Sequence, residues 1–145
     1  ESILTEPSST RELREKWLEF CDALFGIWLE HPQVFQIVAQ ECMAGLPVAE
    51  KLFKGSFIRC FEVFSQFFSA AQARKLLRPG LNPEAAAALL LSAMHDVMRV
   101  NPLIKKIRGT DLADPAFRTE LVRQWVAVVI DGILNPASRQ ETRPS

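Results

Sequence analysis

Apolar residues recur along this chain at intervals of three and four, the spacing that places them on one face of an α-helix. No run alternates Val, Ile and Thr with polar residues, no Asn-Gly turn occurs, and the chain contains no tyrosine. Strands and hairpins normally carry those signals. The pattern therefore predicts an all-α fold.

Capping residues and prolines divide this pattern into five expected helices. Ser9 or Thr10, with Glu12 shortly afterwards, predicts the start of the first helix, and a proline stands near the expected start of each of the others. We expect helices over about residues 10–30, 33–44, 48–73, 84–100 and 115–134. Residues 101–114 are expected to form a longer connection with room for a short helical turn. Residues 1–9 are expected to be the end of a linker helix or a disordered lead-in, and residues 135–145 a flexible tail.

The segment SFIRCFEVFSQFF, residues 56–68, holds five of the ten phenylalanines of the chain. Projected as a helix at about 100° per residue, it gathers its rings within an arc of about 120°, with the polar residues on the opposite side. This helix is therefore expected to have one buried face and one solvent-exposed face. The rings either fill an ordinary core or line a cavity for an apolar molecule, and the segment alone leaves both possibilities open.

The helices expected at 84–100 and 115–134 are apolar over much more of their circumference. A five-helix chain of this size rarely buries two such helices completely. We therefore expect a second chain to bury their remaining apolar surface, and the alternative is a monomer that buries both helices itself. We expect a bundle of five main helices whose last two form a four-helix interface in a homodimer. The interface residues expected are Leu90, Met94, Val97, Leu121, Trp125, Val128, Val129 and Ile133.

Charge and cysteine content narrow the choice of partners and compartment. The 17 Lys and Arg residues balance 17 Asp and Glu residues, which gives no general attraction to nucleic acid or anionic lipid. No apolar run reaches the roughly 18 residues that span a bilayer. Cys21, Cys42 and Cys60 are too far apart for a disulfide framework or a zinc site. We therefore expect reduced thiols in a cytoplasmic protein without membrane partners.

Motifs for catalysis are missing from the sequence. It contains no Gly-rich phosphate loop, no G-x-S-x-G, no H-E-x-x-H and no C-x-x-C, and its two histidines do not favour a transition-metal site. We expect no enzyme activity, no cofactor and no bound metal. His95, surrounded by Ala, Leu and Met, is either a hydrogen-bonded histidine at a helix interface or a polar anchor in a cavity.

The order of features resembles a known family. A helix ends in EHPQ, VFQIVAQE follows, the loop LRPGLNP leads into EAAAALLLSAM, and a last apolar helix contains LVRQWVAVVIDGIL. This succession, over residues 10–134, resembles the C-terminal domain of TetR-family transcriptional regulators. The resemblance implies an all-helical domain that binds a small effector in an inner cavity and dimerises through its last two long helices. The family's helix-turn-helix is not in these residues, so DNA would be contacted only through a domain upstream of Glu1.

The resemblance also places the first helix opposite the phenylalanine-rich face, with the effector between them. The ligand-binding residues expected are Trp17, Cys21, Leu24, Phe25, Trp28, Phe57, Phe61, Phe64, Phe68 and His95. Apolar walls with a few polar groups suit a small hydrophobic or aromatic effector. We therefore expect an effector-binding and dimerisation domain of a TetR-like regulator. The alternatives are a helical protein-interaction module and a small carrier of hydrophobic molecules.

Overall fold

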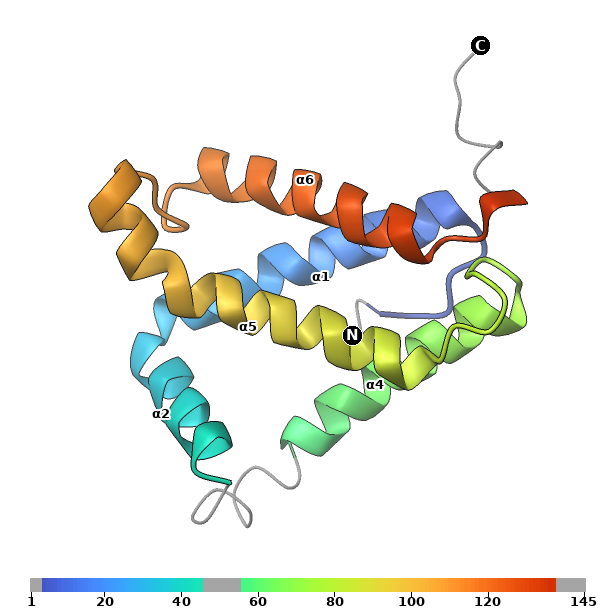
Figure 1. The fold of residues 1–145 in the computed structure, drawn as a ribbon, viewed down its shortest axis with the longest axis horizontal. Coiled ribbons are helices and arrows are strands. Elements are labelled where there is room, and N and C mark those ends of the chain that lie inside the picture. The colour runs from blue at the N-terminus through green and yellow to red at the C-terminus, as the bar shows by residue number, and fades with distance from the viewer. Residues whose placement is uncertain (1–3, 46–55, 138–145) are drawn as a thin grey trace.

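The computed structural model describes residues 4–45 and 56–137, and within them the chain is all-α. The helices are α1 (Thr10–Glu30), α2 (Pro32–Met43), α4 (Ser56–Ala73), α5 (Pro83–Arg108) and α6 (Pro115–Ile133) (Figure 1). The predicted all-α bundle of five main helices is confirmed. The part of the expected third helix before Ser56 lies outside the described residues, and the second chain stays a prediction.

Helix α1 runs the length of the bundle and organises the packing around it. Helix α6 packs along α1, while α5 packs along α4 and also contacts α1. Helices α5 and α6 run in opposite directions across the side that faces the viewer in Figure 1. The core takes one buried stripe from each of these four helices. The two ends of α1 consequently have different neighbours, α4 near the start and α2 near the end.

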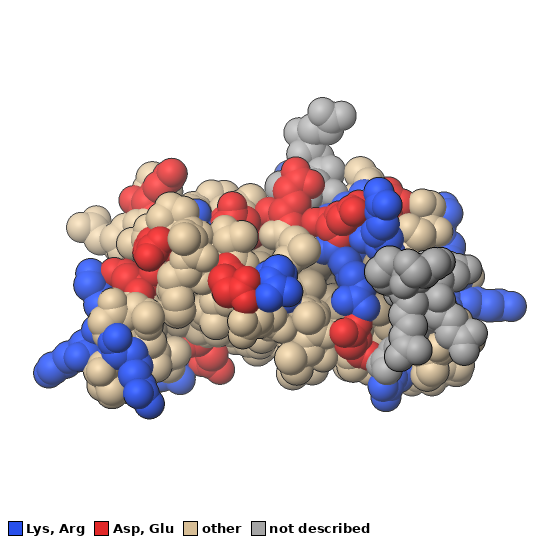
Figure 2. All heavy atoms as spheres, turned by 90° about the horizontal axis from the view of Figure 1, so that it is seen from above, with Lys and Arg blue, Asp and Glu red and all other residues tan. Residues whose placement is uncertain are grey.

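The surface carries charges of both signs. Lys and Arg side chains are interspersed with Asp and Glu side chains over the face shown in Figure 2, which agrees with the balanced composition. Two of the ion pairs join α1 to α6: Arg118 binds Asp22 at 2.9 Å, and Arg14 binds Asp131. In both pairs the carboxylate is about half-exposed, and ion pairs that water can screen stabilise a fold only modestly. Burial of apolar side chains is therefore the main source of stability.

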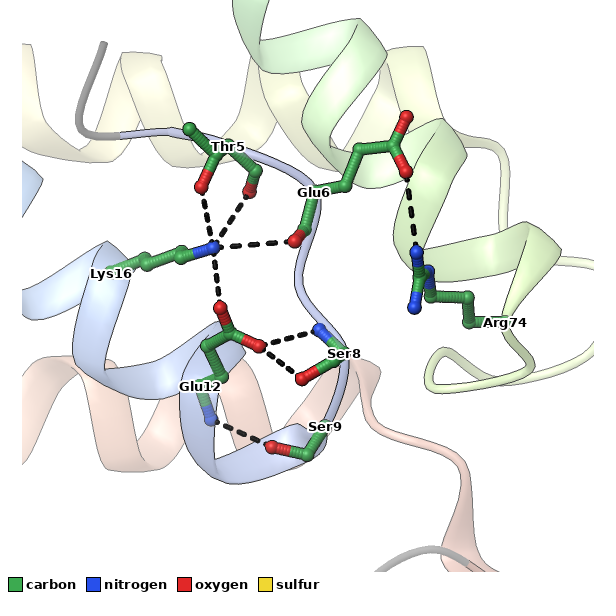
Figure 3. A network of polar contacts seen from close by, with 7 residues as sticks. All are labelled: Thr5, Glu6, Ser8, Ser9, Glu12, Lys16 and Arg74. Atoms are coloured by element: carbon green, nitrogen blue, oxygen red, sulfur yellow. Dashed lines mark hydrogen bonds and ion pairs between the residues drawn. The ribbon is translucent and has the colours of Figure 1, made fainter. Parts of the chain in front are cut away.

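A polar network fixes the start of α1 (Figure 3). The Ser9 hydroxyl accepts a hydrogen bond from the Glu12 backbone N–H at 3.1 Å, and the Glu12 carboxylate accepts one from the Ser8 backbone N–H at 2.7 Å. Lys16 Nζ lies 2.6 Å from the other Glu12 oxygen and 2.6 Å from the Thr5 hydroxyl. Lys16 and the Ser8 donors lower the pKa of Glu12 to about 2. The helix start predicted from Ser9 and Glu12 is confirmed.

The chain from residue 4 to residue 9 forms no helix and lies against the bundle. The Leu4 side chain is only 8% exposed, so it belongs to the core. Glu6 forms an ion pair with Arg74, just beyond the end of α4, at 3.3 Å. The described part of the lead-in is therefore neither a linker helix nor detached from the bundle. The flexible tail expected after residue 134 falls mostly on residues outside those described.

Helix α5 is longer than the sequence pattern predicted. The predicted end at Val100 is wrong, because the helix continues through Pro102 to Arg108. A proline removes one hydrogen bond to the preceding turn and its ring displaces the carbonyl there, so a helix that continues past it bends. Figure 1 shows the last turns of α5 bending away from the axis of the rest. The helix ends at Gly109, whose φ of 73° is the left-handed conformation that favours glycine.

Side chains near the proline hold this extension in place. The Asn101 amide donates to Asp111 Oδ1 at 3.0 Å, and its oxygen accepts from the Leu112 backbone N–H at 3.0 Å. Lys105 Nζ lies 2.7 Å from the other Asp111 oxygen. These contacts keep the pKa of the Asp111 carboxyl well below its usual range. They tie the end of α5 to the loop that leads into α6, which is why the helix can continue where a connection was expected.

Candidate functional site

The rings shared by α1 and α4 form a packed core. Trp17 lies 5.4 Å from Phe64 and 5.5 Å from Phe68 between ring centroids, and Phe20 meets Phe64 edge-on at 4.7 Å. The side chains of Trp17, Phe64 and Phe68 are 0% exposed. Such separations and burial are typical of an interior at native packing density. This part of the phenylalanine-rich face therefore has the geometry of ordinary core.

Cys21 belongs to the same core. Its side chain is 0% exposed, and its Sγ lies 3.7 Å from Met94 Sδ on α5. Burial raises the pKa of the Cys21 thiol far above its ordinary value. The thiol therefore stays protonated, and a protonated buried thiol is a poor nucleophile and a poor metal ligand.

The ten residues expected to bind a ligand separate into three groups. Those buried in the core are Trp17, Cys21, Phe25, Phe64 and Phe68. Those with part of the side chain exposed are Leu24, Trp28, Phe61 and His95. The side chain of Phe57 lies outside the described part of the chain. Among the described side chains of this set, only Trp28 lines a cleft, and His95 contacts the rings of Trp28 and Phe35 beside it.

A cleft of about 340 Å³ opens between the last turn of α1, helix α2 and the second half of α5. These elements meet at the left of Figure 1. The lining residues are Trp28, Leu29, Pro32, Phe35, Gln36, Ala39, Gln40, Met43, Met98, Arg99, Asn101 and Pro102. Mostly apolar walls with a few polar groups, at this volume, are typical of small-molecule sites.

Three rings from three helices meet beside this cleft. Phe35 of α2 lies 5.3 Å from Trp28 of α1 and 4.9 Å from His95 of α5, and Trp28 lies 6.4 Å from His95. The tight turn after α1 produces the contact, because the His31 carbonyl accepts hydrogen bonds from the backbone N–H groups of Val34 and Phe35. That turn begins α2 immediately and brings Phe35 back toward the end of α1.

His95 has an unsatisfied nitrogen at this point. Its Nε2 atom is buried and has no hydrogen-bond partner in the described part of the protein. Burial lowers the pKa of the imidazole; Asp96 opposes this effect, and Arg99 adds to it. The ring is therefore neutral near pH 7, so each ring nitrogen is either a donor or an acceptor. An unsatisfied buried polar atom next to a cleft is a position where a ligand group gains a hydrogen bond.

No protein-family model, curated protein or solved structure matches this chain. The resemblance to TetR-family regulators therefore stays a prediction from the sequence. Between residues 4 and 45 and between 56 and 137, no three His, Cys, Asp or Glu side chains are grouped so that they could hold a metal ion. Within those same ranges, no helix combines the length and the apolarity needed to cross a bilayer.

The residues expected at a dimer interface occupy different environments. Leu90 and Met94 are 0% exposed and Ile133 is 8% exposed, so they fill the core of one protomer and offer almost no surface to a second. Val97, Leu121, Trp125 and Val129 are half-buried against that core. Val128 is 75% exposed, and Leu89, which was not among the expected interface residues, is 60% exposed. One step along a helix rotates a side chain by about 100°, which separates buried Leu90 from exposed Leu89.

Proposed function

We propose that the cleft binds a small apolar or aromatic molecule, and that the chain is the effector-binding and dimerisation domain of a TetR-like transcriptional regulator. The observation that carries the proposal is the cleft of about 340 Å³ beside Trp28, Phe35 and His95. A ring or an alkyl chain in the cleft would cover partly exposed aromatic surface, and a polar group on it could satisfy His95 Nε2.

The regulatory step would be a shift between populations of conformations. A ligand in the cleft contacts the end of α1, all of α2 and the second half of α5 at once. It would favour the arrangement in which these helices are closest, by no more than its difference in affinity for the two arrangements. The two DNA-binding domains of a dimer must match half-sites about 34–36 Å apart. A small tilt of α1 relative to α5 would change the distance between these domains and therefore the affinity for DNA.

A thermal-shift and fluorescence titration with small aromatic and aliphatic compounds tests the cleft. We expect a saturable increase in Tm that grows with ligand concentration, because the ligand binds only the folded state. Trp28→Ala should abolish the shift, since it removes one ring from the wall. Trp125→Ala is the matched control, because Trp125 is a half-buried tryptophan on α6 that does not line the cleft, and it should leave the shift in Tm unchanged. No response to any compound, or equal binding by both variants, would contradict the proposal.

Sedimentation at several protein concentrations tests the dimer. The most exposed apolar side chains on α5 and α6 are Leu89 and Val128 in the described chain, apart from those on the last turns of α5. Leu89→Glu combined with Val128→Glu should convert a dimer to monomers and leave the helical content unchanged, because neither side chain contributes to the core. A wild-type chain that stays monomeric at the highest concentration would contradict the dimerisation half of the proposal.

A helical protein-interaction module remains the second candidate, and one observation favours it. Ile27 of α1 and Val34 and Ile37 of α2 are each more than half-exposed, at 54%, 54% and 53%. Exposed apolar side chains close together in sequence can form part of a docking surface. The same ligand titration distinguishes the two functions, because a docking module would show no saturable response to small molecules.

A further inference from the structure

We propose that the molecule bound in the cleft is an amphipathic acid, with a carboxylate on Arg99 and an apolar body on the rings of Trp28 and Phe35. This inference rests on the proposed ligand-binding function of the cleft and specifies the chemical class of the ligand. The three observations behind it are the charge of the lining, the hydrogen-bonding state of Arg99, and the positions of Arg99 and His95 along α5.

Among the residues that the structure describes, the lining carries a single charged residue. Arg99 contributes the cation, and the other lining residues are apolar or neutral amides. In the described part of the chain no carboxylate lines the cleft, and Asp96, which pairs with Arg99, is not a lining residue, so an anion in the cleft meets a cation in its wall. A neutral apolar ligand would leave this cation without a role, whereas an organic acid would use both the apolar wall and the charge.

The guanidinium of Arg99 has donors to spare. Its Nε donates to Asp96 Oδ1 at 3.0 Å, and the two side chains are 57% and 63% exposed, so the pair is solvent-screened and weak. In the described part of the chain, neither terminal nitrogen of Arg99 donates a hydrogen bond. A guanidinium binds a carboxylate through two parallel hydrogen bonds, and Arg99 can do so while it keeps Asp96.

The spacing along α5 matches a short acid. His95 and Arg99 are four residues apart, which places them one turn apart on the same face of the helix, with about 5–6 Å between their Cβ atoms. His95 contacts Phe35 and Trp28, so the aromatic wall and the cation are separated by about one helical turn. That separation suits a single-ring acid or a medium-chain fatty acid, in which the apolar body and the carboxylate are directly joined.

Matched pairs of probes test the inference: phenylacetate against 2-phenylethanol, and octanoate against 1-octanol. The affinity of the intact chain is measured by calorimetry at pH 7 and low salt. We expect each acid to bind at least tenfold more tightly than its alcohol, and we expect added salt to reduce the difference because it screens the charge. Arg99→Gln should remove the preference for the acid and leave the affinity for the alcohol within about twofold, and Arg99→Lys should keep part of the preference.

Arg78→Gln is the control, because Arg78 is an exposed arginine in the loop after α4 and does not line the cleft. It should leave the preference for acids unchanged, and thermal unfolding checks that every variant is folded. Equal affinity of wild type for acid and alcohol would overturn the inference and leave the cleft as a binding site. Equal losses for acid and alcohol in Arg99→Gln would also overturn it, since Arg99 would then support only the shape of the cleft. Binding of neither class would defeat the proposed function itself.

Discussion

The two aromatic regions along α1 have similar residues, but one is buried and the other borders an open cleft. Near the start of α1, Trp17 packs against Phe64 and Phe68 of α4 and is 0% exposed. Near its end, Trp28 packs against Phe35 of α2 and lines an open cleft. Both regions bring a tryptophan of α1 together with phenylalanine rings of another helix, yet only the second leaves space for a ligand. The number of rings therefore does not decide where a site forms.

Coverage by neighbouring helices is what separates the two regions. The first half of α1 packs against α6, its Trp17 contacts Phe64 and Phe68 of α4, and Leu4 adds to the same core. The last turn of α1 has the short helix α2 beside it, a helix of 12 residues that presents Phe35 and leaves most of its other side chains at least partly exposed. The tightly covered region contributes most to the free energy of unfolding, and the partly covered region leaves apolar surface exposed that a ligand can bind.

Replacing Trp17 or Trp28 with alanine should give the largest difference between the two regions in the free energy of unfolding. Trp17→Ala should lower the free energy of unfolding by about 3–5 kcal/mol, because it leaves a large cavity in the core. Trp28→Ala should lower it by only about 1–2 kcal/mol, because Trp28 is partly exposed before the change. Urea denaturation followed by circular dichroism measures both values. Equal losses would mean that the cleft region is packed as tightly as the core, and would remove the distinction.

Adding volume should sharpen the same contrast. Ala71 of α4 is 0% exposed in the core, and Ala39 of α2 lines the cleft. Ala71→Phe should cost about 1–3 kcal/mol because it overpacks the interior. Ala39→Phe should change stability by no more than about 0.5 kcal/mol and should block ligand binding by filling the cleft. Denaturation and ligand titration on both variants check this, and ligand binding that survives Ala39→Phe would place the site elsewhere.

The capping residues made the helix starts predictable from the sequence, whereas the end of α5 was predicted wrongly. Asn82 accepts hydrogen bonds from the backbone N–H groups of Glu84 and Ala85, and Asp114 accepts from those of Ala116 and Phe117, at the starts that were expected. The end of α5 was expected at Val100, just before Pro102, whereas the helix ends at Gly109. The better signal was three basic residues in the last turn followed by glycine, a combination typical of a helix C-terminus.

The candidate site was predictable only in part. Trp28 and His95 were among the expected ligand-binding residues; Trp28 lines the cleft, and His95 contacts the lining residues Trp28 and Phe35. Phe35 and Met98 were missed, because their role depends on how α2 folds back against α5, and no periodicity within a single helix contains that information. Leu90 was assigned to an interface because a helix that is apolar nearly all round does not reveal which side faces its own core.

A smaller effect should distinguish stability from binding. Ser9→Ala removes the hydroxyl that accepts from the Glu12 backbone N–H, and such a loss usually costs about 1 kcal/mol. The affinity for a cleft ligand should not change, since Ser9 is at the opposite end of α1 from Trp28. Ser69→Ala, an exposed serine within α4, is the matched control and should be nearly neutral. Weaker ligand binding in Ser9→Ala would show that the two regions are coupled through α1.

The smallest expected effect is a pH dependence from His95, and its sign is fixed by the direction of the pKa shift. Burial lowers the pKa of His95 in the folded chain below its ordinary value of 6.5. As pH falls below 6.5, the unfolded chain binds a proton that the folded chain does not, so the folded state loses stability until the pH reaches the lowered pKa. His95→Gln should lack this loss. The Tm of wild type minus that of the variant should therefore decrease between pH 7.5 and pH 5.

Contributions from the rest of the chain cancel in this difference, because all residues other than His95 are the same in both proteins. Asp96 and Arg99 act on the His95 imidazole in opposite directions, so burial beside Phe35 and Trp28 decides the sign. A ligand that donates a hydrogen bond to an unprotonated Nε2 atom should lower the pKa further and steepen the loss at low pH, whereas a ligand that avoids His95 should leave it unchanged. If the Tm of wild type and that of His95→Gln change in parallel with pH, the His95 ring is solvated and is not buried beside the cleft.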